Sequence, residues 1–240
     1  GVQITSDNSS GYAGGVAGDS WGGNIENCSV SGSVSGTVFA GGVVGSQVGG
    51  SITGCNSSAT VKGVIFAGGI AGETNYGATL TACYATGDVT VENDGTNNSH
   101  AGGVVGYNGG GTLTACYATG SVTGSGSGTI YVGGVTGHNS GTLTACYHAN
   151  GTISCPAGTT GGVTGRNYKS FNDPVITACY WGSNGQTQGI GDNQAGTGET
   201  TQVDGTVTWN MAMTSMNQAL QEAGSEWQYE PGDSLPTLNK

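Results

Sequence analysis

The chain repeats one short pattern six times along its 240 residues. Each copy begins with a Gly-Gly pair, reaches a leucine or isoleucine about ten residues later, and has a cysteine three positions after that. The Gly-Gly pairs begin at Gly14, Gly41, Gly68, Gly102, Gly133 and Gly161, and the cysteines are Cys28, Cys55, Cys83, Cys116, Cys146 and Cys179. Because periods of roughly 20–50 residues are typical of stacked repeats, the structure of one copy sets the fold of the whole region.

The composition argues against several classes of function. The chain contains 50 glycines, charged residues make up only 8% of it, and its formal net charge is -11. Four cationic residues cannot build a surface that follows a phosphate backbone, so we expect no nucleic-acid partner. The same shortage argues against an anionic membrane surface, and no run of about 20 apolar residues is present. We therefore expect no membrane insertion within this chain.

The fourth copy predicts how one repeat folds. Its apolar runs are short and bounded by Gly and Asn, which is typical of strands and not of helices. Val104 and Val105 are expected to form one strand, followed by a turn over residues 106–111. Leu113 is expected to begin a second strand, and Val122 to lie in a third.

Alternation along the strands then predicts which side chains face inward. Cys116 and Ala118 share one face, whereas Leu113 has the wrong parity unless the chain bends near Ala115. With that bend, three columns point inward. They are Val16, Val43, Ile70, Val104, Val135 and Val163; Ile25, Ile52, Leu80, Leu113, Leu143 and Ile176; and the six repeat cysteines. No copy can bury its own apolar face, so we predict an all-β fold, a parallel β-solenoid of about six rungs. A propeller blade would need about four strands and roughly 40–45 residues.

The regular cysteines are interpreted as a structural column. No Cys-x-x-Cys pair is present, and the three histidines do not follow the cysteine register. A thiol that recurs at one position of each rung acts as a small buried hydrophobe. Pairing or metal binding by some stacked cysteines is the alternative. Cys155 lies outside the register and is expected to be exposed, either free or paired with a neighbour. We assign no metal site and no cofactor.

The residues Gly102-Gly-Val-Val-Gly-Tyr-Asn and Leu113-Thr-Ala-Cys-Tyr-Ala-Thr-Gly-Ser-Val resemble the GLUG-motif repeat. The resemblance covers about residues 11–185. The first two copies depart from it, with Ser29 and Asn56 where later copies have Tyr. Similar repeats occur in bacterial surface and secreted proteins, including adhesin-like proteins and the non-catalytic part of some immunoglobulin A-cleaving metallopeptidases. The resemblance implies an extracellular or cell-surface location and a structural or adhesive use, and it brings no catalytic residues.

The repeat is lost after Cys179, which divides the chain into a repeat solenoid over 1–205 and a C-terminal cap over 206–240. Met213, Met216 and Leu220 have helical spacing and are followed by Gly224, so a short helix is expected there. Solenoids need caps that cover the last apolar layer, and this helix with Trp227 is suited to that role.

Residues next to the inward columns are expected to point outward. The neighbours of the later cysteines would form an exposed aromatic column that could contact sugar rings or a protein, or serve as a structural ladder: Tyr84, Tyr117, Tyr147 and Tyr180. A second column contains Thr53, Thr81, Thr114, Thr144 and Thr177, and three copies read Thr-x-Thr, a pattern that is also favoured simply for strand packing. Asp88, Glu92 and Asp94 offer oxygen ligands for calcium, but their spacing matches no known calcium loop.

Three classes of function remain. The first hypothesis is a non-catalytic module of the bacterial cell surface that presents an extended face to a host glycan or surface protein, as a monomer or as part of a larger surface protein. The alternatives are a carbohydrate-active β-helix enzyme and an ice-binding solenoid. The enzyme would need acids or cations that converge in a groove, and here only Asp173, Arg166 and Lys169 form a local charged group. We therefore expect no enzymatic activity.

Overall fold

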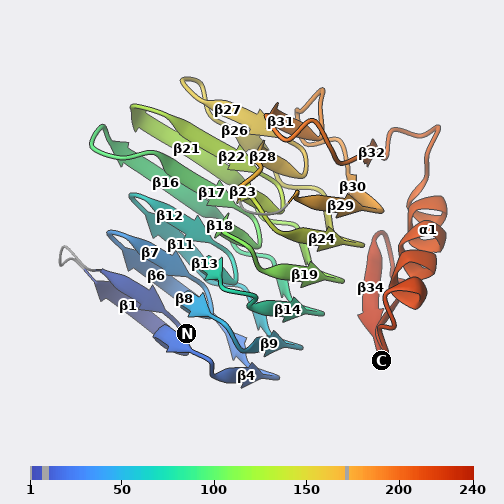
Figure 1. The fold of residues 1–240 in the computed structure, drawn as a ribbon, viewed down its shortest axis with the longest axis horizontal. Helices are drawn as coiled ribbons and strands as arrows, with labels where there is room; N and C mark the ends of the chain where they lie inside the picture. The colour runs from blue at the N-terminus through green and yellow to red at the C-terminus, as the bar shows by residue number, and fades with distance from the viewer. Residues whose placement is uncertain (1, 7–10, 171–172) are drawn as a thin grey trace.

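The chain forms a parallel β-solenoid, as the repeats predict (Figure 1). The computed structural model describes residues 2–6, 11–170 and 173–240. Each full coil of the solenoid contributes one strand to each of five parallel sheets, which we number I to V in order from the strand that contains the first glycine of each Gly-Gly pair. Strands of successive coils pair in register, so equivalent residues of the repeats lie next to one another.

Sheets I and II are joined by the Gly-Gly corner. Sheet I contains β2 (Tyr12–Gly14), β7 (Phe39–Gly41), β12 (Phe66–Gly68), β17 (Ser99–Gly102), β22 (Ile130–Gly133) and β27 (Thr159–Gly161). Sheet II contains β3 (Ala17–Trp21), β8 (Val44–Val48), β13 (Ala71–Asn75), β18 (Val105–Asn108), β23 (Thr136–Asn139), β28 (Thr164–Asn167) and β31 (Ile190–Asn193).

Sheets III, IV and V complete each coil. Sheet III contains β4 (Asn24–Glu26), β9 (Ser51–Thr53), β14 (Thr79–Thr81), β19 (Thr112–Thr114), β24 (Thr142–Thr144) and β29 (Val175–Thr177). Sheet IV contains β5 (Ser29–Val30), β10 (Asn56–Ser57), β15 (Tyr84–Ala85), β20 (Tyr117–Ala118), β25 (Tyr147–His148), β30 (Cys179–Trp181) and β32 (Thr200–Gln202). Sheet V contains β1 (Val2–Ser6), β6 (Gly32–Gly36), β11 (Thr60–Gly63), β16 (Val89–Asp94), β21 (Val122–Ser127) and β26 (Ile153–Ser154).

The coil has more strands than the three expected from the apolar runs. In the fourth coil, Val104 lies at the corner between β17 and β18 and not in a strand. Gly106 to Asn108 belong to β18, so the expected turn shrinks to residues 109–111. The difference arises because glycine is accepted inside these strands where two backbones approach closely. A Cβ atom on Gly106 would lie 2.7 Å from the nitrogen of Ala67, on sheet I.

A left-handed residue makes the predicted corner before each cysteine. Ala115 has φ of 54°, and its equivalents in the other coils are also left-handed. They are Asn27, Gly54, Ala82, Ala145 and Ala178. Since non-glycine residues adopt this conformation rarely, its recurrence in every coil marks a required change of direction. The corner lets Leu113 and Cys116 both face the interior, where each is fully buried.

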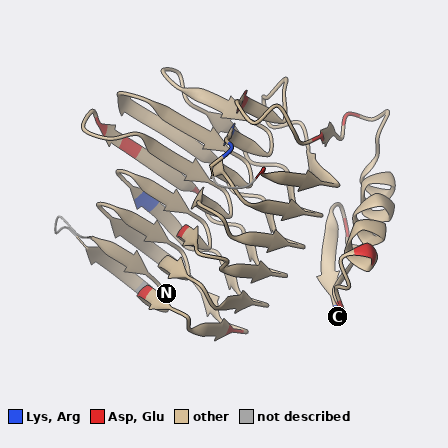
Figure 2. Ribbon diagram, in the orientation of Figure 1, with Lys and Arg blue, Asp and Glu red and all other residues tan. Residues whose placement is uncertain are grey.

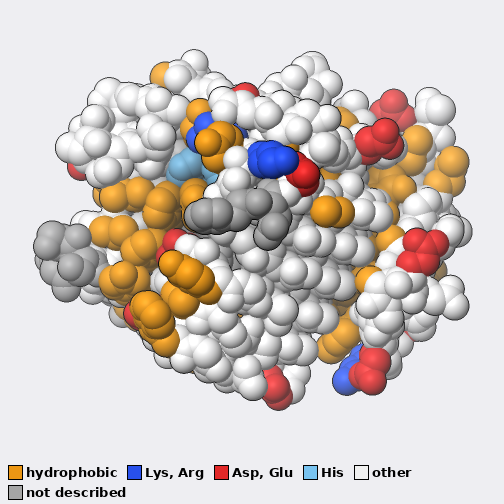
Figure 3. Space-filling model, viewed as in Figure 1, with side chains coloured by type: hydrophobic (Ala, Val, Ile, Leu, Met, Phe, Trp, Pro, Cys, Tyr) orange, Lys and Arg blue, Asp and Glu red, His pale blue; other side chains and the backbone are white. Residues whose placement is uncertain are grey.

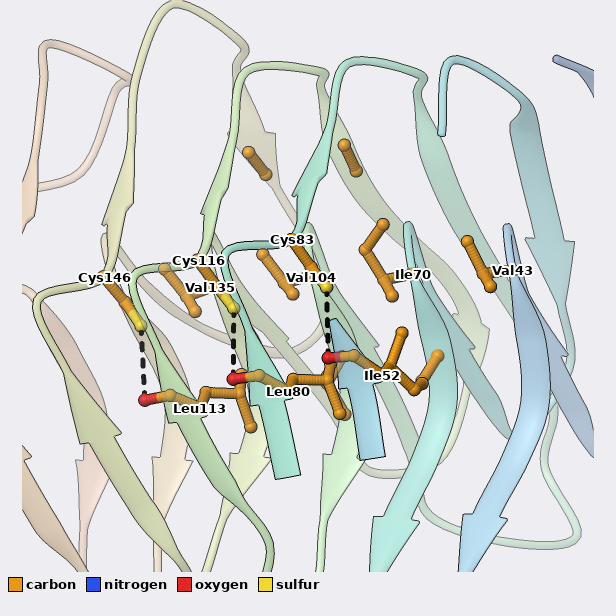
Figure 4. Close-up of a cluster of buried hydrophobic side chains, with 14 of the residues drawn as sticks. Val43, Ile52, Ile70, Leu80, Cys83, Val104, Leu113, Cys116, Val135 and Cys146 are labelled. Carbon is orange, nitrogen blue, oxygen red and sulfur yellow. Dashed lines mark hydrogen bonds between the residues drawn. The ribbon is translucent and has the colours of Figure 1, made fainter. Parts of the chain in front are cut away.

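The three predicted core columns are buried, with exceptions at the N-terminal end of the stack (Figure 4). Val16 is 47% exposed and Cys28 is half-buried, because no coil precedes theirs to cover them. Figure 4 shows Cys83, Cys116 and Cys146 with each sulfur directed toward the carbonyl oxygen of a leucine or isoleucine in the preceding coil. These Sγ–O distances are 3.5–3.7 Å.

A buried ladder of polar side chains follows the end of sheet II. The Thr74 hydroxyl donates to Asn108 over 3.0 Å, Asn108 donates to Asn139 over 2.9 Å, and Asn139 donates to Asn167 over 3.1 Å. All four side chains are fully buried. Asn108 and Asn139 also bond the backbone of the turns into sheet III, so the ladder fixes successive turns in the same conformation.

The C-terminal segment packs against the flank of the solenoid, where we had expected it to cover the end (Figure 1). It consists of α1 (Trp209–Glu222) and an antiparallel hairpin of β33 (Gln228–Pro231) and β34 (Pro236–Asn239). Thr208 caps the helix by accepting a hydrogen bond from the Met211 nitrogen, and Gly224 follows the helix with φ of 69°. Within the part of the chain that the structure describes, no helix has the length and apolar character needed to cross a bilayer.

We predict that the ladder contributes strongly to stability. Asn139→Ala removes the partner of Asn108 and Asn167 inside the core, and should lower the free energy of unfolding by about 2–4 kcal/mol in urea denaturation. The matched control is Asn56→Ala, because Asn56 makes its side-chain bond to Ser29 at the surface. It should cost less than about 1 kcal/mol, and equal losses for the two variants would contradict the role of the ladder.

Candidate functional site

The predicted tyrosine column exists, but it is not the exposed surface that we expected. Tyr84, Tyr117 and Tyr147 stack with ring centroids 5.0 Å and 4.7 Å apart. Tyr117, Tyr147 and Tyr180 are buried and Tyr84 is half-buried, because the C-terminal helix and hairpin cover them. The Tyr147 hydroxyl donates to the Pro236 carbonyl over 2.5 Å. The column is therefore the surface on which the cap packs. The aromatic surface that we expected to be exposed is instead covered by the cap.

The cap also places its own side chains against the column. The Tyr229 hydroxyl donates to the carbonyl of Ala145 over 2.9 Å, next to the left-handed corner of the fifth coil. Met216 and Leu220 of α1 lie in the same buried cluster. Burial and the neighbouring Tyr84 raise the pKa of Tyr117 to about 12.

The cysteine column is structural. All seven cysteines are free thiols. Burial raises the pKa of the Cys146 and Cys179 thiols well above the ordinary value, which disfavours the reactive thiolate. Cys155 was expected to be exposed, but it is buried beneath sheet I, and burial raises its pKa as well. The reason is that the chain around Gly158 folds back over its sulfur atom.

The threonine columns form the outer face of sheet III. In β9, β14, β19 and β24 the middle residue is buried, and the hydroxyl residues on either side are half-buried or exposed. The rows are in register from Ser51 to Thr142 and from Thr53 to Thr144. No charged residue occurs in these four strands. The face is therefore a flat array of hydroxyl and methyl groups.

Sequence reasoning missed an aromatic column on sheet I. The residue two positions before each of the first five Gly-Gly pairs carries a ring and points outward. These residues are Tyr12, Phe39, Phe66, His100 and Tyr131. Neighbouring ring centroids are 4.7–5.4 Å apart. The recurrence of an aromatic residue before Ala-Gly-Gly or Val-Gly-Gly was a readable signal for this column.

Exposure falls along this column, because Phe39 and Phe66 are half-buried between an exposed first ring and buried later ones. Tyr12 is 39% exposed, whereas His100 and Tyr131 are buried. Two further aromatic side chains project near the N-terminal half of sheet II, with Trp21 76% and Tyr76 80% exposed. Figure 3 shows hydrophobic side chains gathered on this face of the molecule, in contrast to the mainly white surface beside them. We call Tyr12, Phe39, Phe66, Trp21 and Tyr76 the aromatic face.

A parallel column on sheet II lies beside the aromatic one. It contains Asp19, Ser46, Glu73, Tyr107, His138, Arg166 and Asp192 in register. Some sheet I rings contact the sheet II residue of the next coil: Phe66 lies 5.0 Å from Tyr107, and His100 lies 5.2 Å from His138. In the sixth coil, the Arg166 guanidinium lies 5.2 Å from the Tyr131 ring and 4.3 Å from the Tyr168 ring.

Charged residues are few, and the cations are all paired. Each of the four cations has an acidic partner: Lys62 with Glu92, Arg166 with Asp192, Lys169 with Asp173, and Lys240 with Glu226. Acidic residues are dispersed over the solenoid and the C-terminal segment (Figure 2). Three of them, Asp88, Glu92 and Asp94, lie in or next to β16. Asp88 accepts from the Ser121 nitrogen, and Asp94 accepts from Thr96. The residues considered for calcium thus have other partners, and no cluster of three or more His, Cys, Asp and Glu suited to a metal occurs among the described residues.

Buried histidines predict that the fold loses stability in acid. Burial lowers the pKa of His138 to about 3 and that of His148 to about 4, and lowers that of His100 well below the usual value. Below pH 6.5 these histidines bind protons in the unfolded chain but stay neutral in the folded chain. Their contribution to the free energy of unfolding is therefore complete above pH 6.5 and is lost as the pH falls.

The loss at pH 5 should be about 2 kcal/mol for each such histidine. His138→Phe retains a ring to stack on Tyr107 and cannot titrate. Urea denaturation at pH 7 and pH 5 should therefore show a smaller loss for this variant than for the wild type. Identical losses would contradict the assignment of His138 as a neutral buried base.

Comparison with known proteins agrees with the repeat geometry. The family model described as the GLUG motif matches the chain twice, at residues 9–35 and 97–123. The second match covers β17 to β20 and the start of β21, so one motif corresponds to about one coil. No curated protein and no solved structure matches the chain. The chain therefore carries two GLUG motifs, and each of them corresponds to about one coil of the β-solenoid.

Proposed function

We propose that this solenoid is a non-catalytic binding module of the bacterial cell surface, which presents the aromatic face to a host glycan or protein. The GLUG motif supports a role as a repeat module. The observation that carries the proposal is the aromatic face itself, since it leaves large apolar side chains exposed on one flank. Exposed apolar patches of this kind commonly mark interaction sites.

The aromatic face is better suited to binding than the column beneath the cap. Trp21 and Tyr76 are largely exposed and need no rearrangement of the fold to contact a partner. Tyrosine and tryptophan offer large contact areas with a polar edge, and lose little conformational freedom on binding. The cap covers the tyrosines of sheet IV, whereas Tyr12, Trp21 and Tyr76 of the aromatic face stay exposed.

The distribution of charge supports a non-catalytic role. Hydrolytic or lyase chemistry on a glycan needs acids and bases that converge on one bond. Here Glu92 and Asp94 lie on one strand, but Glu92 pairs with Lys62 and Asp94 accepts from Thr96. Arg166, which the sequence placed in a charged group with Lys169 and Asp173, pairs instead with Asp192 (Figure 2). The Arg166 guanidinium also packs on the rings of Tyr131 and Tyr168, so its partners all lie within the fold.

A glycan and host-protein array probed with the full chain tests this proposal. Trp21→Ala should weaken binding to an array ligand about tenfold, because tryptophan residues at interface centres contribute strongly. Met211→Ala is the matched control, since Met211 is 54% exposed on the cap and should leave binding unchanged. Failure to bind any array member, or cleavage of a polysaccharide by the purified chain, would contradict the proposal.

Ice binding is a second candidate, favoured by the threonine array of sheet III. Four successive coils present Ser-x-Thr or Thr-x-Thr in register on a flat face, with coils about 4.8 Å apart. Such a regular surface can order water at its hydroxyl and methyl groups.

The test is thermal hysteresis during ice growth. If the array binds ice, Thr114→Tyr should lower the hysteresis by more than half by disrupting the flat face, whereas Thr152→Tyr, at an exposed site outside sheet III, should not. No hysteresis from the wild-type chain would reject this candidate.

A further inference from the structure

The later coils of the solenoid show how this flank holds a cation. The Arg166 guanidinium lies between the rings of Tyr131 and Tyr168, and its Nε atom is 3.6 Å from a carboxylate oxygen of Asp192. A second nitrogen donates to Gln194 over 3.0 Å. Aromatic faces and a carboxylate together recognise guanidinium groups through cation–π attraction and charge-assisted bonding. The column pair on sheets I and II is therefore able to bind a guanidinium.

The third and fourth coils repeat this chemistry without a cation of their own. Glu73 occupies the same sheet II column as Arg166, three coils from it, and its neighbour in register is Tyr107. The Phe66 ring lies 5.0 Å from Tyr107. Rings and a carboxylate are thus adjacent here, as they are around Arg166.

Glu73 is held in place and has no cationic partner among the residues that the structure describes. Its carboxylate accepts from Ser46 over 3.2 Å and from Asn75 over 3.4 Å. Every lysine and arginine of the chain pairs with another acid. Burial raises the pKa of Glu73, with the charge of Asp19 adding to the rise and the two hydrogen bonds opposing it. A cation brought to this carboxylate would relieve an unfavourable charge.

A hollow beside these groups provides room for a side chain. Asn75, Tyr76, Tyr107, Gly109 and Gly110 line a cavity of about 340 Å³ that opens to the surface. Asn75 lines the hollow and also donates to Glu73, so it links the hollow to the carboxylate. Tyr76 lines the hollow and is 80% exposed, so its ring lies at the rim of the hollow. Its backbone is left-handed, with φ of 49°.

We propose that Glu73, Tyr107 and Tyr76 bind an arginine or lysine side chain of a basic segment in a partner protein. The proposal rests on the proposed binding function and narrows the partner to a polypeptide that carries positive charge. The net charge of -11 favours approach of such a partner to this face.

The probe is a terminally blocked pentapeptide with one central arginine, compared with the same peptide that carries neutral citrulline. Titration of the full chain, followed by backbone NMR, should show binding of the arginine peptide at least tenfold tighter than that of the citrulline peptide. The shifted amide signals should include those of Tyr76 and Tyr107.

Glu73→Gln tests the carboxylate, because it removes the charge and keeps the shape. It should weaken binding of the arginine peptide about tenfold. Glu26→Gln is the matched control, since it makes the same charge change at an exposed site of sheet III, and should change affinity less than twofold. Tyr76→Ala provides a second variant whose exposed position leaves the fold intact, with an expected loss of about fivefold.

Two results would overturn the proposal: equal affinity for the arginine and citrulline peptides, or equal effects of Glu73→Gln and Glu26→Gln. A neutral glycan that binds the array and is insensitive to Glu73→Gln would also overturn it, while leaving the broader binding function standing. If the chain binds no array member and neither peptide, both this proposal and the broader binding function are wrong.

Discussion

Hydrogen bonding between successive coils is the interaction on which the rest of the structure depends. Because strands pair in parallel and in register, each side chain has its counterparts from the previous and next repeats as its nearest neighbours. The sequence of one coil must therefore be compatible with copies of itself. Residues that associate well with their own kind are favoured at every position, and residues that repel their own kind are penalised.

This condition explains the side chains that the chain uses and those that it avoids. Amides can donate to one neighbour and accept from the other, as Asn108, Asn139 and Asn167 do inside the core. Aromatic rings stack face to face, as Tyr117 and Tyr147 do. Like charges placed directly opposite destabilise a sheet, which accounts for the low content of charged residues.

Much of the solenoid could be predicted from the sequence, because its core is periodic. The apolar columns and the corner at Ala115 followed from parity alone, and both are present. The number of strands in a coil could not be obtained in the same way, since glycines inside strands look like turn residues until the opposing backbone is known. The amide ladder left a signal, a Gly-x-Asn triplet such as Gly137-His-Asn139, that apolar periodicity does not register.

The surface was harder to predict than the core. The exposure of Tyr147 depends on Pro236 and Tyr229, which are more than eighty residues away in sequence and belong to no repeat. Parity tells which side of a strand a residue faces, and says nothing about what covers that side. The aromatic column of sheet I could have been predicted from the sequence. Its contact with Tyr107, and the position of Tyr107 next to Glu73, depend on how sheets I and II pack.

The position of the C-terminal helix and hairpin along the flank has a mechanical consequence. A plain stack of coils can open one coil at a time from either end, because each coil contacts only its neighbours. Here a single apolar cluster joins the segment to Tyr84, Tyr117, Tyr147 and Tyr180, which belong to four successive coils. The segment therefore holds these four coils together, and tension along the stack must detach it before the coils can separate one by one.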